Sequence, residues 1–139
     1  MIIGLLMLAI VLLSVLLHYL CLLGLSRLMP GLRIPDPLKI LVGVVGALIA
    51  HVVEVGLFAI AYYNMSGTGD WGELQGAFNG TMADSLYFSF ATYTTLGYGD
   101  INPVGAVRYL TGLEALTGFV LITWTASFLF LEMRRYWDR

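Results

Sequence analysis

Three stretches of the chain are apolar over enough residues to cross a bilayer as helices, at 2–25, 38–63 and 104–131. A helix needs about 20 consecutive apolar residues to span the ~30 Å hydrocarbon core. The first stretch has no charged side chain, and it lacks the basic start, the short apolar run and the small-residue cleavage site of a signal peptide. The pattern therefore predicts three transmembrane helices.

A fourth apolar segment is too short to span. Thr81 and Asp84 fit a helix N-terminus, with a hydroxyl at the cap and a carboxylate three residues on. The aromatic run that follows, 85–94, suits a re-entrant helix buried in protein. The glycine-rich, acidic residues before it are typical of an exposed outer loop.

Composition excludes several classes of protein. Of the 139 residues, 59% are hydrophobic and only 12% are charged, so a water-soluble domain is excluded. The net charge of −2 and the scattered basic residues argue against nucleic-acid binding. One cysteine cannot form an intrachain disulfide, and no nucleophile motif or metal-ligand cluster indicates an enzyme or a bound cofactor.

The basic residues predict an orientation. Three lie near the first loop and three in the tail, and one, Arg108, lies beside the central segment. The positive-inside rule places the first loop and the C-terminus in the cytoplasm, with the N-terminus outside the cell membrane. The six residues of the two clusters are Arg27, Arg33, Lys39, Arg134, Arg135 and Arg139.

Two glycines alternate with larger residues in the string that follows the short helix, at Gly97 and Gly99. Glycine at these positions lets successive carbonyls point the same way along an extended strand. Irregular backbone at membrane depth is tolerated where it is buried in protein or lines a water-filled path. Four such strands around an axis would replace the water shell of a permeating cation.

The string Thr-Leu-Gly-Tyr-Gly-Asp at 95–100 resembles the potassium-channel signature Thr-Val-Gly-Tyr-Gly-Asp, and 88–94 resembles the pore helix of that family. The resemblance implies an all-α polytopic membrane protein, with three transmembrane helices, a re-entrant pore helix and a selectivity filter, assembling as a homotetramer. It divides the chain into an additional N-terminal helix and loop (1–37) and a pore domain (38–139). The pore domain comprises an outer helix 38–63, an outer loop 64–80, a pore helix 81–94, a filter 95–100 and an inner helix 104–132.

The resemblance also implies roles for single residues. Asp100 would lie at the outer mouth, and Leu96 departs from the usual valine but still offers its backbone carbonyl. An aromatic cuff of Tyr87, Phe88 and Tyr93 would brace the filter together with Tyr98. The ion-binding filter would consist of Thr95, Leu96, Gly97, Tyr98 and Gly99, with K⁺ held at the first four. Negative potential at the mouth would come from Asp70, Glu73, Asp84 and Asp100.

Gly118 resembles the hinge glycine of the inner helix, although a plain packing role fits this glycine-tolerant segment equally well. If Gly118 faces the pore, helical spacing predicts a lining stripe of Ile122, Ala126 and then Leu129 or Phe130. A bulky apolar ring at the inner end could gate by dewetting.

Two carboxylates lie deep within predicted spans, Glu54 with His51 one turn before it and Glu114 near Gly118. A charge there costs at least ~2.5 kcal/mol on insertion scales, so each must be paired, protonated or facing water. Two hypotheses stay open: a structural bond from Glu54 to His51 or to pore-helix groups such as Thr92, or a pH- or ion-sensing role.

The predicted function is passive, K⁺-selective conduction in a lipid bilayer by a homotetramer, with K⁺ as the permeant ion and no other cofactor. The alternatives are a non-selective cation channel and a non-conducting accessory membrane subunit. Reversal potentials under K⁺ and Na⁺ gradients distinguish them.

Overall fold

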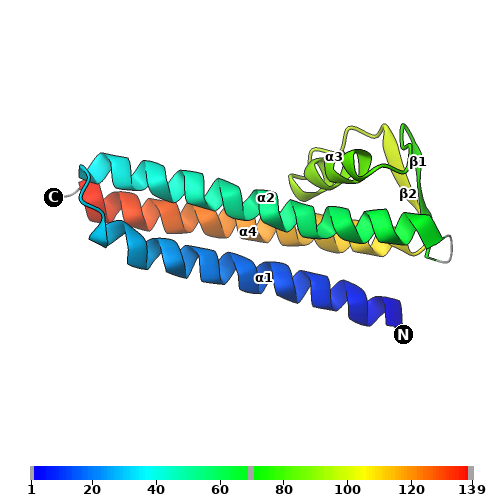
Figure 1. Cartoon of the computed structure of the whole chain (residues 1–139), viewed down its shortest axis with the longest axis horizontal. Coiled ribbons are helices and arrows are strands. Elements are labelled where there is room, and N and C mark those ends of the chain that lie inside the picture. The colour runs from blue at the N-terminus through cyan, green and yellow to red at the C-terminus, as the bar shows by residue number, and fades with distance from the viewer. Residues whose placement is uncertain (1, 69–70, 138–139) are drawn as a thin grey trace.

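Three long helices lie side by side along the molecule (Figure 1). The computed structural model describes residues 2–68 and 71–137. The helices are α1 (Ile2–Leu28), α2 (Asp36–Thr68) and α4 (Val107–Trp137), and a short 3-10 turn, η1 (Met29–Gly31), precedes the link to α2. All three are long and apolar enough to cross a membrane, as predicted. Each helix continues beyond the C-terminal end of its apolar run, whereas α4 begins three residues later than predicted, because residues 101–104 form a strand.

One stripe of α1 faces the other helices, and most of its remaining surface is exposed. The inward residues recur at intervals of three, four or seven, as one face of a helix requires. Two of them, Ser14 and His18, are polar and fully buried. The stripe consists of Met7, Ser14, His18, Leu22 and Leu25.

Small residues of α2 allow α1 and α4 to approach closely. A Cβ atom on Gly46 would lie 2.5 Å from Cδ2 of Leu25 in α1, and one on Gly43 would lie 3.0 Å from Sδ of Met29 in η1 and 3.4 Å from Cδ2 of Leu129 in the third long helix. Ala47 and Ala50 are buried on the same helix. Close packing through small residues is the means by which membrane helices associate.

A fourth helix, α3 (Met82–Tyr93), lies at one end of the bundle, beside the C-terminal part of α2 (Figure 1). With 12 residues it is about 18 Å long, too short to span a bilayer. The Thr81 hydroxyl accepts the backbone N–H of Asp84 at 3.0 Å, which is the predicted cap. The Asp84 carboxylate reaches back to accept the backbone N–H of Asn79 at 2.9 Å.

The residues expected to form an outer loop are more ordered than the sequence suggested. α2 continues to Thr68, and strand β1 (Glu73–Gly76) pairs antiparallel with β2 (Ile101–Val104). Each strand is four residues long, without an alternating apolar pattern, and β2 contains Pro103. Tertiary pairing therefore determines these strands, and it joins the beginning and the end of the segment that carries α3.

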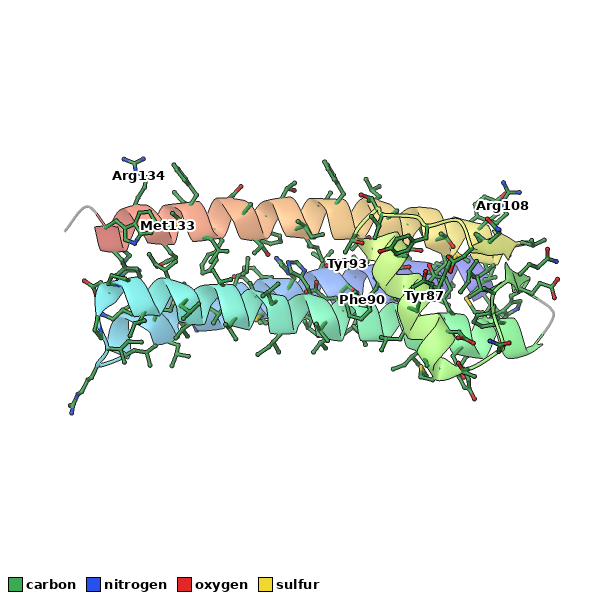
Figure 2. All side chains as sticks on the ribbon, turned by 90° about the horizontal axis from the view of Figure 1, so that it is seen from above. Tyr87, Phe90, Tyr93, Arg108, Met133 and Arg134 are labelled. Atoms are coloured by element: carbon green, nitrogen blue, oxygen red, sulfur yellow. The ribbon has the colours of Figure 1, made fainter. Side chains whose placement is uncertain are left out.

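The two ends of the bundle differ in charge. Figure 2 shows Arg108 and Arg134 at opposite ends of α4, with α3 near Arg108. The N-terminal end of α1 lies at the α3 end, whereas the turn between α1 and α2 lies at the other end with the C-terminus (Figure 1). The basic residues near this turn therefore lie at the same end of the bundle as Arg134.

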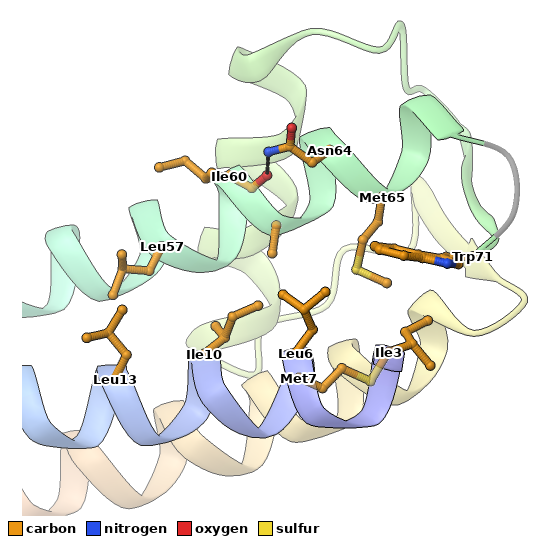
Figure 3. A pocket seen from close by; sticks show the side chains of 11 residues that line it. Ile3, Leu6, Met7, Ile10, Leu13, Leu57, Ile60, Asn64, Met65 and Trp71 are labelled. Atoms are coloured by element: carbon orange, nitrogen blue, oxygen red, sulfur yellow. Dashed lines mark hydrogen bonds between the residues drawn. The ribbon is translucent and has the colours of Figure 1, made fainter. Parts of the chain in front are cut away.

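An apolar pocket of about 400 Å³ lies between α1 and α2 near the α3 end. Ile3, Leu6 and Ile10 line it from α1, and Met65 and Trp71 lie across from them (Figure 3). Its lining fits lipid or other apolar contacts and offers little for a polar ligand.

Candidate ion pathway and its supports

The segment that follows α3 leaves the helix through backbone hydrogen bonds to its last turn. The Thr95 N–H donates to the Thr92 carbonyl at 2.9 Å, and the N–H groups of Leu96 and Gly97 both donate to the Ala91 carbonyl, at 2.9 and 3.1 Å. These bonds direct the N–H groups of the segment back toward α3. Its carbonyl groups are therefore left to face away from the helix.

The backbone of this segment alternates in conformation. Thr95, Gly97 and Gly99 have φ values of 58°, 56° and 80°, whereas Leu96 and Tyr98 between them have negative φ. Such alternation turns successive carbonyls toward one side, which an ordinary strand cannot do. The two glycines were foreseen, but Thr95 adopts the same conformation with a side chain that makes it costly, by roughly 1–2 kcal/mol.

Residues 94–100 are all exposed in the single chain. Within the described residues, no hydrogen-bond donor reaches the carbonyl oxygens of Thr95, Leu96, Gly97 or Tyr98. Backbone carbonyls at membrane depth are costly when they have no partner. A row of such oxygens is suited to ligating a cation.

The outer end of the segment is held by Tyr87 of α3. Its ring stacks on Tyr98, with 6.1 Å between centroids and 7° between planes. Its hydroxyl donates to the Asp100 carboxylate at 2.9 Å, and this hydrogen bond raises the pKa of Tyr87, so the phenol remains a donor at physiological pH. The Ala77 N–H donates to the Asp100 carbonyl at 2.9 Å.

Acidic groups surround this end of the molecule. Asp100 and Glu73 are exposed, Asp84 is half-buried, and Asp70 lies outside the described residues. The Asn79 backbone N–H and then the Thr81 hydroxyl lower the pKa of Asp84, so it stays ionised at neutral pH. The described carboxylates place negative charge at this end of the molecule.

Glu54 is fully buried and supports the last turn of α3. Its carboxylate accepts the Tyr93 hydroxyl, lies 3.1 Å from Nδ1 of His51, and lies 2.9 Å from Nδ1 of His18 in α1. The contact with His51 is one that the sequence suggested. The contact with α3 comes from Tyr93, the neighbour of the suggested Thr92.

Glu114 is also fully buried, and it supports the middle of α3 from α4. It accepts the hydroxyl of Tyr62 in α2 and the hydroxyl of Ser89 in α3, each at 2.5 Å. Ser89 and Tyr93 are four residues apart and share one face of α3. The two buried carboxylates therefore hold one face of this helix at two successive turns.

Gly118 lies against α3 as well. A Cβ atom there would be 2.1 Å from the Tyr93 carbonyl oxygen, so the position permits close helix contact. Further along α4, Ile122, Ala126 and Phe130 are exposed on a surface that the other helices of this chain do not cover. The structure brings Gly118 to the end of α3, with the other three in a line beyond it.

Sequence reasoning missed His18, Tyr62 and Ser89 as partners of the buried acids, and Thr125 as a partner of both histidines. Their positions in separate helices carry no local signal. Each is a polar residue within an apolar run, and this interruption of the run is the only sequence feature that points to a role.

Comparisons with known proteins agree with this geometry. A family described as ion channel matches residues 50–135. The inward rectifier potassium channel Kirbac3.1 of Paramagnetospirillum magnetotacticum is 34% identical over 86 residues, which cover 61% of this chain and 28% of that protein. Protein LctB of Bacillus caldotenax and of Geobacillus stearothermophilus are 42% and 45% identical over 40 residues, 29% of this chain and 30% of each relative. No solved structure matches significantly.

Three spans, with a short helix and an exposed carbonyl row between the second and third, define a multi-pass membrane protein of the channel class. The chain belongs to the ion channel family, and the potassium-channel resemblance of its sequence is confirmed. It is a channel and not an enzyme. The matched segments span less than a third of these relatives' own lengths.

Proposed function

We propose that this chain forms a homotetrameric, K⁺-selective channel that conducts passively across a cell membrane, with its N-terminus outside and its C-terminus in the cytoplasm. The observation that carries the proposal is the alternation of positive and negative φ from Thr95 to Gly99. This alternation turns the carbonyl groups toward one side, where their oxygens would replace the water molecules that hydrate K⁺. The bound ions then move by knock-on between adjacent sites.

Four chains are needed because one carbonyl row cannot enclose an ion. In the single chain the side chains of Leu96 and Tyr98 are 58% and 65% exposed, although they adjoin an apolar pocket lined by Phe90 and Ala91. Neighbouring subunits would cover these side chains and hold the four rows at equal distance from the axis. Such contacts would bury the Leu96 side chain, which is larger than the usual valine, while its backbone carbonyl would stay in the row.

The inner half of the pathway would be lined by α4. Ile122, Ala126 and Phe130 lie on its uncovered surface, and Phe130 is 58% exposed. A ring of four phenylalanines is apolar enough to gate by dewetting. There Gly118 would allow α4 to pack closely against the end of α3, next to the innermost ion site at Thr95.

Reversal potentials of the purified chain in planar bilayers test this proposal. With K⁺ and Na⁺ present on both sides in opposed gradients, the potential should lie near the K⁺ equilibrium value. Gly99→Ala, which forces a side chain into a backbone with φ 80°, should abolish that selectivity. Equal permeability of the two ions would instead assign a non-selective cation channel, and absence of current with an intact assembly would assign an accessory subunit.

A further inference from the structure

A cluster of two histidines and a carboxylate lies between α1 and α2. The potential ligand atoms of His18, His51 and Glu54 all lie within 4.8 Å of one another. The two imidazole rings are 5.2 Å apart between centroids. His18 and Glu54 are fully buried, and the His51 side chain is 15% exposed. Such a combination of ligands is one that binds divalent transition metals.

The hydrogen bonds of this cluster cannot all be satisfied by neutral histidines beside an ionised Glu54. Both Nδ1 atoms face the carboxylate, at 2.9 and 3.1 Å, and both Nε2 atoms face the Thr125 hydroxyl oxygen, at 3.3 and 3.0 Å. A neutral imidazole has one N–H, and a hydroxyl has one proton and two lone pairs. If both protons lie on Nδ1, Thr125 can supply a donor to only one Nε2. If both lie on Nε2, two nitrogen lone pairs face a carboxylate. With His18 protonated on Nδ1 and His51 on Nε2, the Thr125 hydroxyl satisfies both Nε2 atoms and His51 Nδ1 can accept the Tyr93 hydroxyl at 3.0 Å, but one lone pair still faces Glu54 at 3.1 Å.

The charge of the cluster leads to the same requirement. Glu54 has histidine nitrogens as its ion-pair partners, and no lysine or arginine lies at that distance in the part of the chain described. Neutral histidines would leave one uncompensated negative charge within a membrane-spanning region, which is costly. A cation among the three ligand atoms offsets the negative charge of Glu54 and separates the facing lone pairs, and Zn²⁺ with one carboxylate and two neutral histidines leaves a net charge of +1 on the cluster.

We propose that His18, His51 and Glu54 bind Zn²⁺, through Nδ1 of each histidine and a carboxylate oxygen. Both Nε2–H groups then donate to Thr125, whose two lone pairs accept them, and this is the outer hydrogen bonding that orients metal-binding histidines. Ligand atoms on a tetrahedral Zn²⁺ lie about 3.4 Å apart at ordinary bond lengths. The two histidine–carboxylate distances, which end on different oxygens of Glu54, must therefore lengthen slightly, and any ligand atoms farther apart, up to 4.8 Å, must move closer together. The Tyr93 hydroxyl, which contacts both Glu54 and His51, lies nearest to the fourth position.

Access to this site is open on one side. A pocket of about 430 Å³ is lined by His51, Tyr93 and Thr125, and also by Ile122 and Ala126 of α4. His18 belongs to α1, outside the family match at 50–135. The site therefore uses a helix that the matched family segment lacks, and zinc would tie that helix to α2 and, through Tyr93, to α3.

The test uses the full chain in detergent after treatment with a chelator. Calorimetric titration with Zn²⁺ should show one ion per chain, and Co²⁺ in its place should give the visible absorption of a tetrahedral nitrogen and oxygen site. His18→Gln and Glu54→Gln should weaken binding at least tenfold, and Thr125→Val by about 10–100-fold. Cys21→Ser, one turn from His18 on α1, is the matched control and should bind as the wild type does.

The Co²⁺ spectrum of the wild type decides the matter even if a variant fails to fold. A wild type that binds no Zn²⁺ and gives no such spectrum overturns the proposal. If nitrogen NMR then shows one histidine doubly protonated at neutral pH, a proton fills the role assigned to zinc. Binding that the His18 and Glu54 variants retain in full also overturns it.

Discussion

The distance between α4 and the end of α3 depends on a single residue, Gly118. The nearest atoms to a Cβ placed there are the Tyr93 carbonyl oxygen at 2.1 Å and its carbon at 2.8 Å, which are backbone atoms with no rotamer to change. Tyr93 is followed two residues later by Thr95, the first residue of the carbonyl row. Any side chain at 118 must therefore move the base of the ion pathway.

We expect Gly118→Ala to lower the stability of the assembled protein by about 1–3 kcal/mol, as overpacking does in a filled interior, and to reduce ion flux. Gly112→Ala on the same helix is the control, since nothing lies within 4 Å of the Cβ position there. Thermal unfolding in detergent and flux from liposomes measure the two effects. Equal stability of the two variants would show that α4 and α3 are not in close contact.

Residue-scale features divide into those with a local cause and those without. The φ values of Gly97 and Gly99 follow from their residue type, so the sequence predicted a carbonyl row there. The positive φ of Thr95 was not predictable, because it arises from the bonds that tie the segment to Ala91 and Thr92. Likewise, both buried acids were recognised, but partners in other helices became identifiable only once the helices were packed.

At the scale of elements, α3 is held by side chains more than by its own length. An isolated helix of 12 residues is marginal in stability, so tertiary contacts must fix it. Ser89 and Tyr93 present hydroxyls on one face to Glu114 and Glu54, which come from two different helices. These contacts set the angle at which α3 presents the carbonyl row.

Ser89→Ala should destabilise the protein by about 1.5–3 kcal/mol, because the fully buried hydroxyl that Glu114 shares with the Val55 carbonyl is lost as a hydrogen-bond partner. Ser85→Ala is the matched control one turn earlier, where the hydroxyl bonds the Thr81 carbonyl at the start of the same helix. That variant should cost about 1 kcal/mol or less. Thermal unfolding of both variants, side by side, measures the difference, and equal losses would contradict the role assigned to Glu114.

The elements differ in how far sequence predicts them. The spans and the Thr81 cap were predictable, since hydropathy and capping act locally. The pairing of β1 with β2 was not, because Gly76 and Ile101 are brought together by the whole segment between them. The glycine-rich, acidic run expected to form a loop therefore includes strand β1, whose pairing with β2 joins the beginning and the end of the segment that carries α3.

For the whole molecule, the decisive feature is that the carbonyl oxygens of residues 95–98 have no hydrogen-bond donor among the described residues of one chain. If four chains share K⁺ among these rows, the ion binds the assembly and not the separated subunit. Ligand binding to one state stabilises it by about 2.7 kcal/mol at a concentration 100 times the dissociation constant. A K⁺-selective tetramer should therefore resist dissociation better in K⁺ than in Na⁺.

Native mass spectrometry in detergent should give a species near four times 15.3 kDa, about 61 kDa. On heating, it should dissociate at a higher temperature in KCl than in NaCl at equal ionic strength. Gly99→Ala should remove this difference, because the altered backbone no longer presents the carbonyls together, whereas Cys21→Ser should keep it. A fully conducting monomer or dimer would refute the tetramer, and equal stability in the two salts would indicate that the carbonyl row does not bind K⁺ in preference to Na⁺.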